Sequence, residues 1–297
     1  MSEVVWTQWE DLKVPPGFTH LHPGNFDLEK SDLSGITFYV PEYMSGQKGL
    51  EFTKKMSSLK HLQMPNAGID DALTYVNPGV TLYNARGVHD ASTAELAVAL
   101  AIAARRGFYD FAKAQSAGSW QHQRYTSFND SKIAILGNGS IAKTLNRYLS
   151  VYDVEIVHFS RSATDGAKAI SEFDSMISEF DVIFLVLPLN TDSKGFINES
   201  KLLRMRHGAT LVNVARGGIV ETDALVKVLN SGSISAGLDV TDPEPLPEDH
   251  QLWSAKNCII TPHVGGDSTA FDSRCKKLVE SQLAKLAAGE PLQNKII

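Results

Sequence analysis

Short apolar segments alternate with helix-like segments through the second half of the chain. Strands are expected where apolar residues run together, at residues 133–136, 154–159, 182–187, 209–214, 234–238 and 258–260. Helices are expected between strands at residues 140–149, 167–178 and 222–229. The segment 182–187 has no polar face, which is typical of a strand covered by helices on both sides. Six strands with intervening helices predict a doubly wound parallel α/β sheet of Rossmann type.

The first part of the chain shows a shorter version of the same alternation. Strands are expected at residues 4–7, 36–40 and 59–64, with a helix at residues 49–58. This pattern predicts a small α/β domain, and a chain of 297 residues is long for one hydrophobic core. A last helix, at residues 273–288, is long enough to run back to the small domain. We therefore expect one domain of residues 1–89 and 272–297, and another of residues 90–271.

An alanine-rich segment without Gly or Pro, residues 92–106, opens the second of these domains. Its residues are apolar around most of a helix's circumference, and such a helix must be buried. It is expected either to pass between the domains or to pack against a second subunit.

Composition and charge exclude several classes of protein. With 43% apolar and 21% charged residues, the composition is typical of a soluble globular protein. The net charge of -6 argues against a nucleic-acid-binding surface, which needs a basic field, but permits a small anionic ligand. The two cysteines, Cys258 and Cys275, have no metal-like spacing, so we expect neither a disulfide framework nor a metal site.

Signals for export or for a membrane are absent from the sequence. The amino terminus is acidic and contains no long apolar run, and no segment approaches about 18 consecutive apolar residues. The low cysteine content favours a reducing compartment. We expect a cytoplasmic protein that does not bind a membrane.

A glycine-rich loop follows the first strand of the larger domain and opens a helix. Its sequence, Gly137-Asn138-Gly139-Ser140-Ile141-Ala142, matches the Gly-x-Gly-x-x-Gly/Ala fingerprint in the context that a dinucleotide site requires. Gly137 permits the tight turn, and Gly139 lets the backbone approach a pyrophosphate at the start of the helix. Ala142, in place of the third glycine, is still small enough for the helix to pack on the strand. The alternative is a tight turn without a ligand.

The residues after the second strand bear on the choice of cofactor. An acidic residue at this place binds the ribose 2′-hydroxyl of NAD, but this chain has Ser160-Arg161-Ser162. Arg161 can pair with a 2′-phosphate through two hydrogen bonds, and the two serines can donate more. We therefore predict NADP (NADPH) as the preferred cofactor, with NAD as the alternative. The competing interpretation is that Arg161 is a solvated surface residue.

Three candidate catalytic residues, Arg216, Glu244 and His263, follow the last three strands, and ligands bind at such strand ends. His263 is the candidate acid, because imidazole titrates near neutrality. Glu244, in a proline-stiffened turn, would orient the ring and raise its pKa. Arg216 would polarise a carbonyl oxygen and bind a substrate carboxylate. Taken singly, Arg216 is compatible with a flexible turn, Glu244 is more typical of a solvated loop acid, and His263 is compatible with a hydrogen-bonded structural histidine. Their common location favours catalysis.

The segments around these residues resemble the signature of the D-isomer-specific 2-hydroxyacid dehydrogenase family. They are Asn213-Val214-Ala215-Arg216-Gly217-Gly218, Gly237-Leu238-Asp239-Val240 through Glu244-Pro245, and Thr261-Pro262-His263-Val264-Gly265-Gly266. Shorter matches lie at Leu187-Pro188-Leu189 with Thr191, Gly195-Phe196-Ile197-Asn198, Thr93-Ala94-Glu95 and Ala67-Gly68-Ile69-Asp70. The resemblance covers nearly the whole chain. It departs from the family pattern at Ala142 and at Ser160-Arg161, where an acidic residue is common.

The resemblance implies an α/β protein of two Rossmann-like domains: a doubly wound parallel-sheet cofactor domain, residues 90–271, and a smaller flavodoxin-like substrate domain. It implies the catalytic roles given above for Arg216, Glu244 and His263. It also implies that family members are usually homodimers, built partly from the helix near residues 92–106.

Further binding residues follow from the resemblance alone. Asp239 would hold the nicotinamide carboxamide, with Ala215, Gly265 and Gly266 near that ring. Other cofactor contacts would come from Thr93, Asn138, Ser140, Ile141, Leu187, Pro188, Val214, Arg216 and His263. The substrate carboxylate would bind the backbone amides of Ala67, Gly68 and Ile69, beside Arg216 and His263.

We therefore expect an oxidoreductase that transfers a hydride from NAD(P)H to a small 2-oxo acid, such as glyoxylate or hydroxypyruvate, to give the D-2-hydroxy acid. One alternative is a phosphoglycerate dehydrogenase-like enzyme. The other is a non-catalytic, dinucleotide-sensing protein of the corepressor type, which shares the fold and can keep the same three residues. A long disordered tail or a peptide-binding insert would favour that second alternative, and neither is evident in the sequence.

Overall fold

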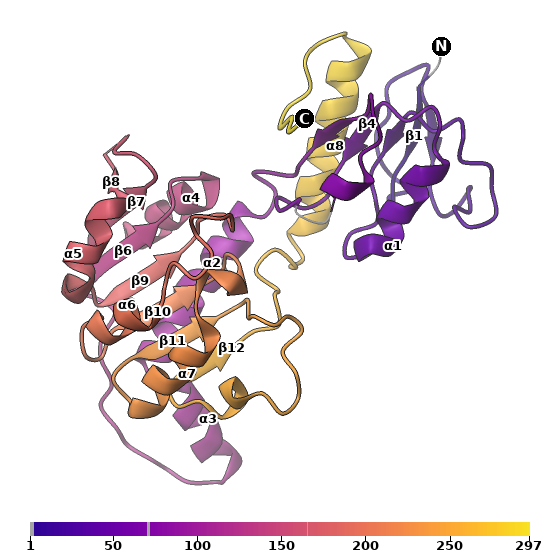
Figure 1. The fold of residues 1–297 in the computed structure, drawn as a ribbon. Coiled ribbons are helices and arrows are strands. Elements are labelled where there is room, and N and C mark those ends of the chain that lie inside the picture. Colours follow the sequence, from indigo (N-terminus) through magenta and orange to yellow (C-terminus); the bar gives the residue numbers. More distant parts are fainter. Residues whose placement is uncertain (1–2, 70–71, 165) are drawn as a thin grey trace. The chain divides into compact units, whose positions relative to one another are not determined.

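The computed structural model describes residues 3–69, 72–164 and 166–297 (Figure 1). The chain divides into two compact units, one comprising Met1–His89 with Thr269–Ile297 and the other Asp90–Ser268. Each unit is built on a parallel sheet of its own. Across the described residues, helices long and apolar enough to cross a membrane do not occur.

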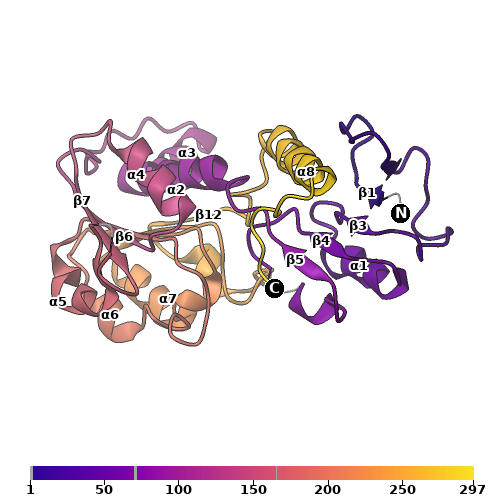
Figure 2. The ribbon, with the colours of Figure 1, turned by 90° about the horizontal axis from the view of Figure 1, so that it is seen from above.

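The smaller unit contains a five-stranded parallel sheet in the order β2-β1-β3-β4-β5. Its strands are β1 (Val4–Trp6), β2 (Thr19–Leu21), β3 (Phe38–Tyr39), β4 (His61–Gln63) and β5 (Thr81–Tyr83). Because successive side chains of a strand point to opposite faces, Val5 and Trp6 enter different hydrophobic clusters. Val5 shares its cluster with α8 (Phe271–Ala287), and Trp6 shares its cluster with α1 (Gly46–Glu51). Figure 2 shows these helices on the two sides of the sheet.

The larger unit contains a seven-stranded parallel sheet in the order β12-β11-β10-β9-β6-β7-β8. Its strands are β6 (Lys132–Leu136), β7 (Glu155–Ser160), β8 (Lys168–Ala169), β9 (Val182–Leu185), β10 (Thr210–Asn213), β11 (Ser235–Leu238) and β12 (Cys258–Ile260). The strand order reverses between β6 and β9, so the loops after these strands run in opposite directions. In doubly wound sheets, ligands bind at this switch point, outside the carboxyl ends of the strands.

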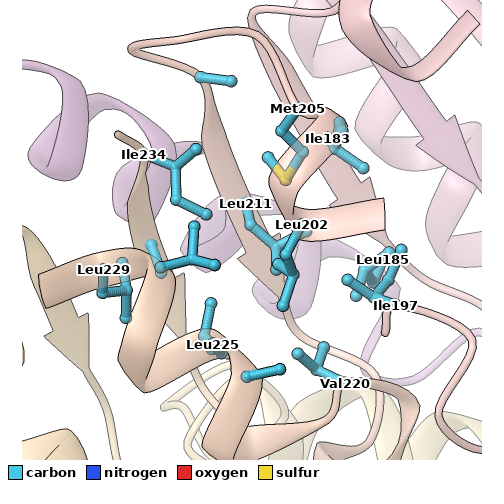
Figure 3. Close-up of a cluster of buried hydrophobic side chains, with 14 of the residues drawn as sticks. Ile183, Leu185, Ile197, Leu202, Met205, Leu211, Val220, Leu225, Leu229 and Ile234 are labelled. Carbon is cyan, nitrogen blue, oxygen red and sulfur yellow. The ribbon is translucent and has the colours of Figure 1, made fainter. Parts of the chain in front are cut away.

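Helices cover both faces of the larger sheet. On one face lie α2 (Asp90–Arg105) and α4 (Ser140–Leu149), and on the other lie α5 (Phe173–Met176), α6 (Glu199–Arg204) and α7 (Thr222–Ser231). Each set of helices packs on the sheet in its own hydrophobic cluster, the first with α2 and α4 and the second with α5, α6 and α7. Strand β9 contributes Phe184 to the first cluster and Ile183 to the second. Figure 3 shows side chains of β9 and β10 meeting those of α6 and α7 in the second cluster. Burying one such leucine or isoleucine contributes about 1.5–3 kcal/mol.

The α/β class, the two parallel sheets and most of the expected elements are confirmed, but the helix expected at residues 167–178 is wrong in its first part. Lys168 and Ala169 form β8 beside β7, so the larger sheet has seven strands rather than six. The remainder is broken into the 3₁₀ turn Ile170–Glu172, α5 and the 3₁₀ turn Ile177–Glu179. Phe173 and Ile177 are fully buried and four residues apart, and this spacing imitates a continuous helix.

The helix expected at residues 49–58 is displaced. It begins earlier, as α1 at Gly46, and continues as the 3₁₀ helix Phe52–Lys55. Four further elements were not expected from the sequence: β2, β5, α6 and α3 (Phe108–Ser116). These elements are short, β2 is only half-buried and α3 is largely exposed, so their apolar periodicity is weak.

Candidate active site

Three loops meet at the carboxyl end of the larger sheet, because β10, β11 and β12 are adjacent and parallel. Arg216 follows β10, Glu244 follows β11 and His263 follows β12. The structure thus brings together the three residues that the sequence singled out. All three lie in the unit Asp90–Ser268.

His263 and Glu244 form a hydrogen-bonded pair, in which Nδ1 and Oε1 are 2.6 Å apart. Their side chains are 43% and 39% exposed, so solvent and small molecules reach both. The hydrogen bond raises the pKa of His263 above its usual value and lowers the pKa of Glu244 below its usual value. The pair therefore favours a protonated imidazole beside an ionised carboxylate.

Arg216 lies in a turn that is fixed by a buried side chain of β10. The side chain of Asn213 accepts a hydrogen bond from the Ala215 N–H (3.1 Å) and donates one to the Arg216 carbonyl (2.9 Å). The positive charge of Arg216 acts on the pKa values of Glu244 and His263, lowering both, more weakly than the hydrogen bond between them. All three side chains therefore belong to one electrostatic site.

The loop that carries Glu244 is held from two sides. A Cβ atom on Gly217 would overlap the carbonyl oxygen of Thr241, so the turn after Arg216 packs directly on this loop. Two hydroxyl groups donate to the loop's carbonyl oxygens: Thr222 Oγ1 to Asp242 at 2.7 Å, and Thr241 Oγ1 to Pro243 at 2.8 Å. Sequence reasoning missed both threonines, because their partners are set by the fold.

The backbone around His263 is held by Asp239, whose side chain is only 2% exposed. Its carboxylate accepts hydrogen bonds from Thr261 Oγ1 (2.6 Å) and from the backbone N–H groups of Val264 (2.9 Å) and Gly265 (2.8 Å). His263 itself has φ = 54°, in the left-handed region that few non-glycine residues adopt. The three bonds flank this residue and fix the loop on either side of it. Thr261 was not among the expected site residues.

The loop after β6 fits a pyrophosphate. Gly137 has φ = 124°, and a Cβ atom there would lie 2.7 Å from the Val186 carbonyl oxygen, so only glycine is accommodated. Two residues further on, Gly139 is exposed and has open space where a Cβ would point. Helix α4 begins at the next residue, Ser140, and its first N–H groups have no partner within the helix. The loop therefore presents backbone donors and the positive end of a helix dipole to an anion.

The residues after β7 lie beside this loop, because β6 and β7 pair in parallel and the Gly137 N–H donates to the Phe159 carbonyl at 2.8 Å. Arg161 is exposed. Ser160 Oγ donates to the Ser162 carbonyl at 2.5 Å, which closes a small turn around Arg161. The guanidinium is thus carried next to the glycine loop on a defined turn.

The remaining residues expected to bind a cofactor all lie in the same unit. Leu187 and Pro188 follow β9, and Val214 and Ala215 follow β10. Thr93 is buried in the first turns of α2, where its methyl group lies next to Gly265. Asn138 and Ile141 belong to the glycine loop and the start of α4, and Gly266 to the loop after β12.

The residues expected to bind the substrate carboxylate belong to the other unit. Ala67, Gly68 and Ile69 follow β4, and Asn84 Nδ2 donates to the Ala67 carbonyl at 2.9 Å. Asp70, the last residue of this motif, lies outside the described residues. The structure does not bring these amides into one unit with Arg216 and His263. A cluster of side chains suited to a metal ion does not occur in the described part of the chain.

Comparison with known proteins decides the family. The model of the D-isomer specific 2-hydroxyacid dehydrogenase NAD-binding domain matches residues 98–265, more than half of the chain. A Corynebacterium melassecola protein described only by its position in the proB 3′ region is 32% identical over 260 residues, 83% of this chain and 84% of that protein. The chain belongs to the D-isomer specific 2-hydroxyacid dehydrogenase family. It is accordingly an NAD(P)-dependent oxidoreductase.

Two of the proteins similar to this dehydrogenase have names that describe an activity. A glyoxylate reductase of Thermococcus litoralis is 29% identical over 301 residues, 95% of this chain and 87% of the relative. Among solved structures, an NADPH-dependent glyoxylate/hydroxypyruvate reductase from Sinorhizobium meliloti, in complex with NADP and sulfate, has a TM-score of 0.81 at 23% identity. That alignment covers 100% of this chain and 98% of the other, and it confirms the two-domain fold.

Proposed function

We propose that this dehydrogenase reduces a small 2-oxo acid of the glyoxylate or hydroxypyruvate type to the D-2-hydroxy acid, with NADPH as its preferred hydride donor. The observation that carries the proposal is the 2.6 Å pair of His263 and Glu244, which shares one unit with Arg216 and the glycine loop. The relative named glyoxylate reductase supports the substrate class.

His263 is the proton donor in this proposal. Because Glu244 engages Nδ1, Nε2 is the nitrogen that gives its proton to the substrate oxygen as a hydroxyl forms. The nicotinamide, when bound, supplies the hydride. The raised pKa of His263 keeps the ring charged and ready for reduction, whereas oxidation of the hydroxy acid needs the neutral ring.

Arg216 binds the substrate in this proposal. Its guanidinium pairs with the carboxylate of the 2-oxo acid and polarises the neighbouring carbonyl oxygen, on which negative charge develops during reduction. The backbone amides of Ala67, Gly68 and Ile69 would hold the same carboxylate. Asp239, Ala215, Gly265 and Gly266 would form the surroundings of the nicotinamide.

The preference for NADPH rests on Arg161, which sits in the turn that Ser160 closes by donating to the Ser162 carbonyl. No carboxylate follows β7 directly, so a 2′-phosphate meets a cation there instead of an anion. Arg161 is exposed next to the glycine loop, where the ribose of a bound dinucleotide would lie. A charge-assisted pair of this kind favours the phosphorylated cofactor.

We further propose that the enzyme is a homodimer that resides in the cytoplasm. Helix α3 and the segment after it expose large apolar side chains: Phe108 is 56% exposed, Phe111 38% and Trp120 97%. Exposed apolar side chains that gather in one segment are typical of a protein interface.

The two buried cysteines, Cys258 and Cys275, are free thiols, which fits a reducing compartment.

A spectrophotometric screen tests the proposed activity. Purified protein is mixed with NADPH or NADH and a panel of 2-oxo acids that includes glyoxylate, hydroxypyruvate, pyruvate and phosphohydroxypyruvate, and oxidation of the cofactor is followed. The proposal predicts the fastest oxidation with NADPH and glyoxylate or hydroxypyruvate. A preference for phosphohydroxypyruvate would favour a phosphoglycerate dehydrogenase. Oxidation with none of these acids would favour a dinucleotide-sensing binding protein.

A further inference from the structure

An acidic side chain lies at the glycine loop, where an anion is expected to bind. Asp90 Oδ1 accepts a hydrogen bond from Ser140 Oγ at 3.0 Å. Ser140 is the first residue of α4, and Asp90 is the first residue of α2. The two helices share one hydrophobic cluster, which includes Ala94 and Ala97 of α2 together with Leu145 of α4. Their packing places both helix starts next to each other and keeps the carboxylate at the loop.

The contact opposes anion binding in two ways. A serine hydroxyl has a single proton to donate, and Ser140 gives it to Asp90. The carboxylate also adds a negative charge next to the exposed Gly139 and the first N–H groups of α4, where the helix dipole alone would attract an anion. The charge is half-buried and therefore less screened than one in open solvent.

We propose that Asp90 determines the affinity of the enzyme for its dinucleotide, weakening binding by repelling the pyrophosphate and by occupying the Ser140 hydroxyl. This inference rests on the proposed function in one respect, that the loop Gly137–Ser140 binds the pyrophosphate. NAD and NADP carry the same pyrophosphate, so Asp90 weakens the binding of both and leaves the preference between them unchanged. Arg161, by contrast, acts on that preference alone.

A purely structural role for Asp90 is separable from this one. A carboxylate in the first turn of a helix stabilises the helix through its dipole. That role predicts a lower melting temperature for Asp90→Asn with an unchanged cofactor affinity. The matched control is Asp223→Asn, which removes an acid from the first turn of α7 in the same unit.

The test is a titration of the full chain with NADPH and with NADH, without substrate, followed by protein fluorescence. For Asp90→Asn we expect the Kd of both cofactors to fall about five-fold, the change that about 1 kcal/mol produces, with their ratio unchanged. Asp223→Asn should bind as the wild type does. In the Ser140→Ala background, the effect of Asp90→Asn should be smaller, because the hydroxyl no longer links the two residues.

Two outcomes would overturn the inference. If Asp90→Asn binds NADPH with an unchanged or higher Kd while the wild type binds normally, Asp90 does not oppose the cofactor and the proposed function stands. If the wild-type chain shows no saturable binding of either dinucleotide, the loop is not a cofactor site, and the proposed function is overturned together with this inference.

Discussion

The position of His263 is fixed by two different carboxylates. Glu244 holds its ring, and Asp239 holds the backbone on either side of it through Thr261, Val264 and Gly265. The sequence identified Arg216, Glu244 and His263 because each lies in the loop that follows a strand. It did not identify Thr261 as a supporting residue, because its 2.6 Å bond to Asp239 exists only once β11 and β12 are side by side.

Removing the charge of Glu244 should move the pH profile of the enzyme. Reduction needs protonated His263, so its rate falls as the pH rises through the pKa of that residue. Since the hydrogen bond to Glu244 raises this pKa, Glu244→Gln should shift the falling limb of kcat/KM to lower pH. The measurement is the pH dependence of NADPH oxidation. The control is Glu248→Gln, an exposed substitution in the same loop, which should leave the falling limb in place. If the limb does not move in Glu244→Gln, Glu244 does not raise the pKa of His263.

Reversing the charge of Arg161 should reverse the cofactor preference. In Arg161→Asp the 2′-phosphate meets a carboxylate, while the 2′-hydroxyl of NADH gains an acceptor. We expect kcat/KM for NADPH to fall about tenfold or more, with that for NADH kept or improved. Arg124→Asp, an exposed change in the same unit, serves as the control. Equal preferences in the wild type and Arg161→Asp would show that Arg161 is a solvated residue.

At the scale of elements, long apolar segments were predictable and short ones were not. Strand β9 was evident because both of its faces are buried. Strand β8 was not, because its two residues pair only with Phe159 and Ser160 and carry no apolar pattern. The close packing of the turn after β10 on the loop after β11 was equally hidden, since it depends on the space at Gly217.

Filling that space should disturb two catalytic loops at once. In Gly217→Ala, the new methyl group overlaps the backbone of Thr241, which cannot move without displacing the loop of Glu244. Overpacking of this kind lowers the free energy of unfolding by about 1–3 kcal/mol, which urea unfolding can measure. We expect kcat to fall as well, because the loop of Glu244 is displaced. Gly218→Ala is the matched control, because the atoms nearest to its methyl group belong to the side chains of Asp242 and Leu189, at 3.3 Å or more. Equal stability of the two variants would contradict this view of the turn.

For the whole molecule, the sequence predicted two α/β units, and the structure describes each of them. The identity of the substrate was not predictable. Arg216 and His263 belong to one unit, whereas Ala67, Gly68 and Ile69 belong to the other. The proposed reaction type therefore rests on residues of the larger unit alone.

The proposed dimer has a direct test in Trp120, which is 97% exposed. If this side chain is buried in a subunit interface, Trp120→Ser should lower the molar mass measured by light scattering toward that of a monomer, about 32.4 kDa. Trp253→Ser, which changes an exposed tryptophan outside α3 and the segment after it, should leave the mass unchanged. A wild-type protein that is already monomeric would refute the proposed homodimer.

If His263 supplies the proton for reduction, the substitution His263→Gln should remove that step while leaving cofactor binding in place. Turnover is measured with NADPH and glyoxylate, and NADPH binding is measured separately by fluorescence. We expect kcat to fall about 10²–10⁴-fold while the Kd for NADPH changes little, because the glycine loop is intact. A variant that turns over like the wild type would show that His263 is not the proton donor.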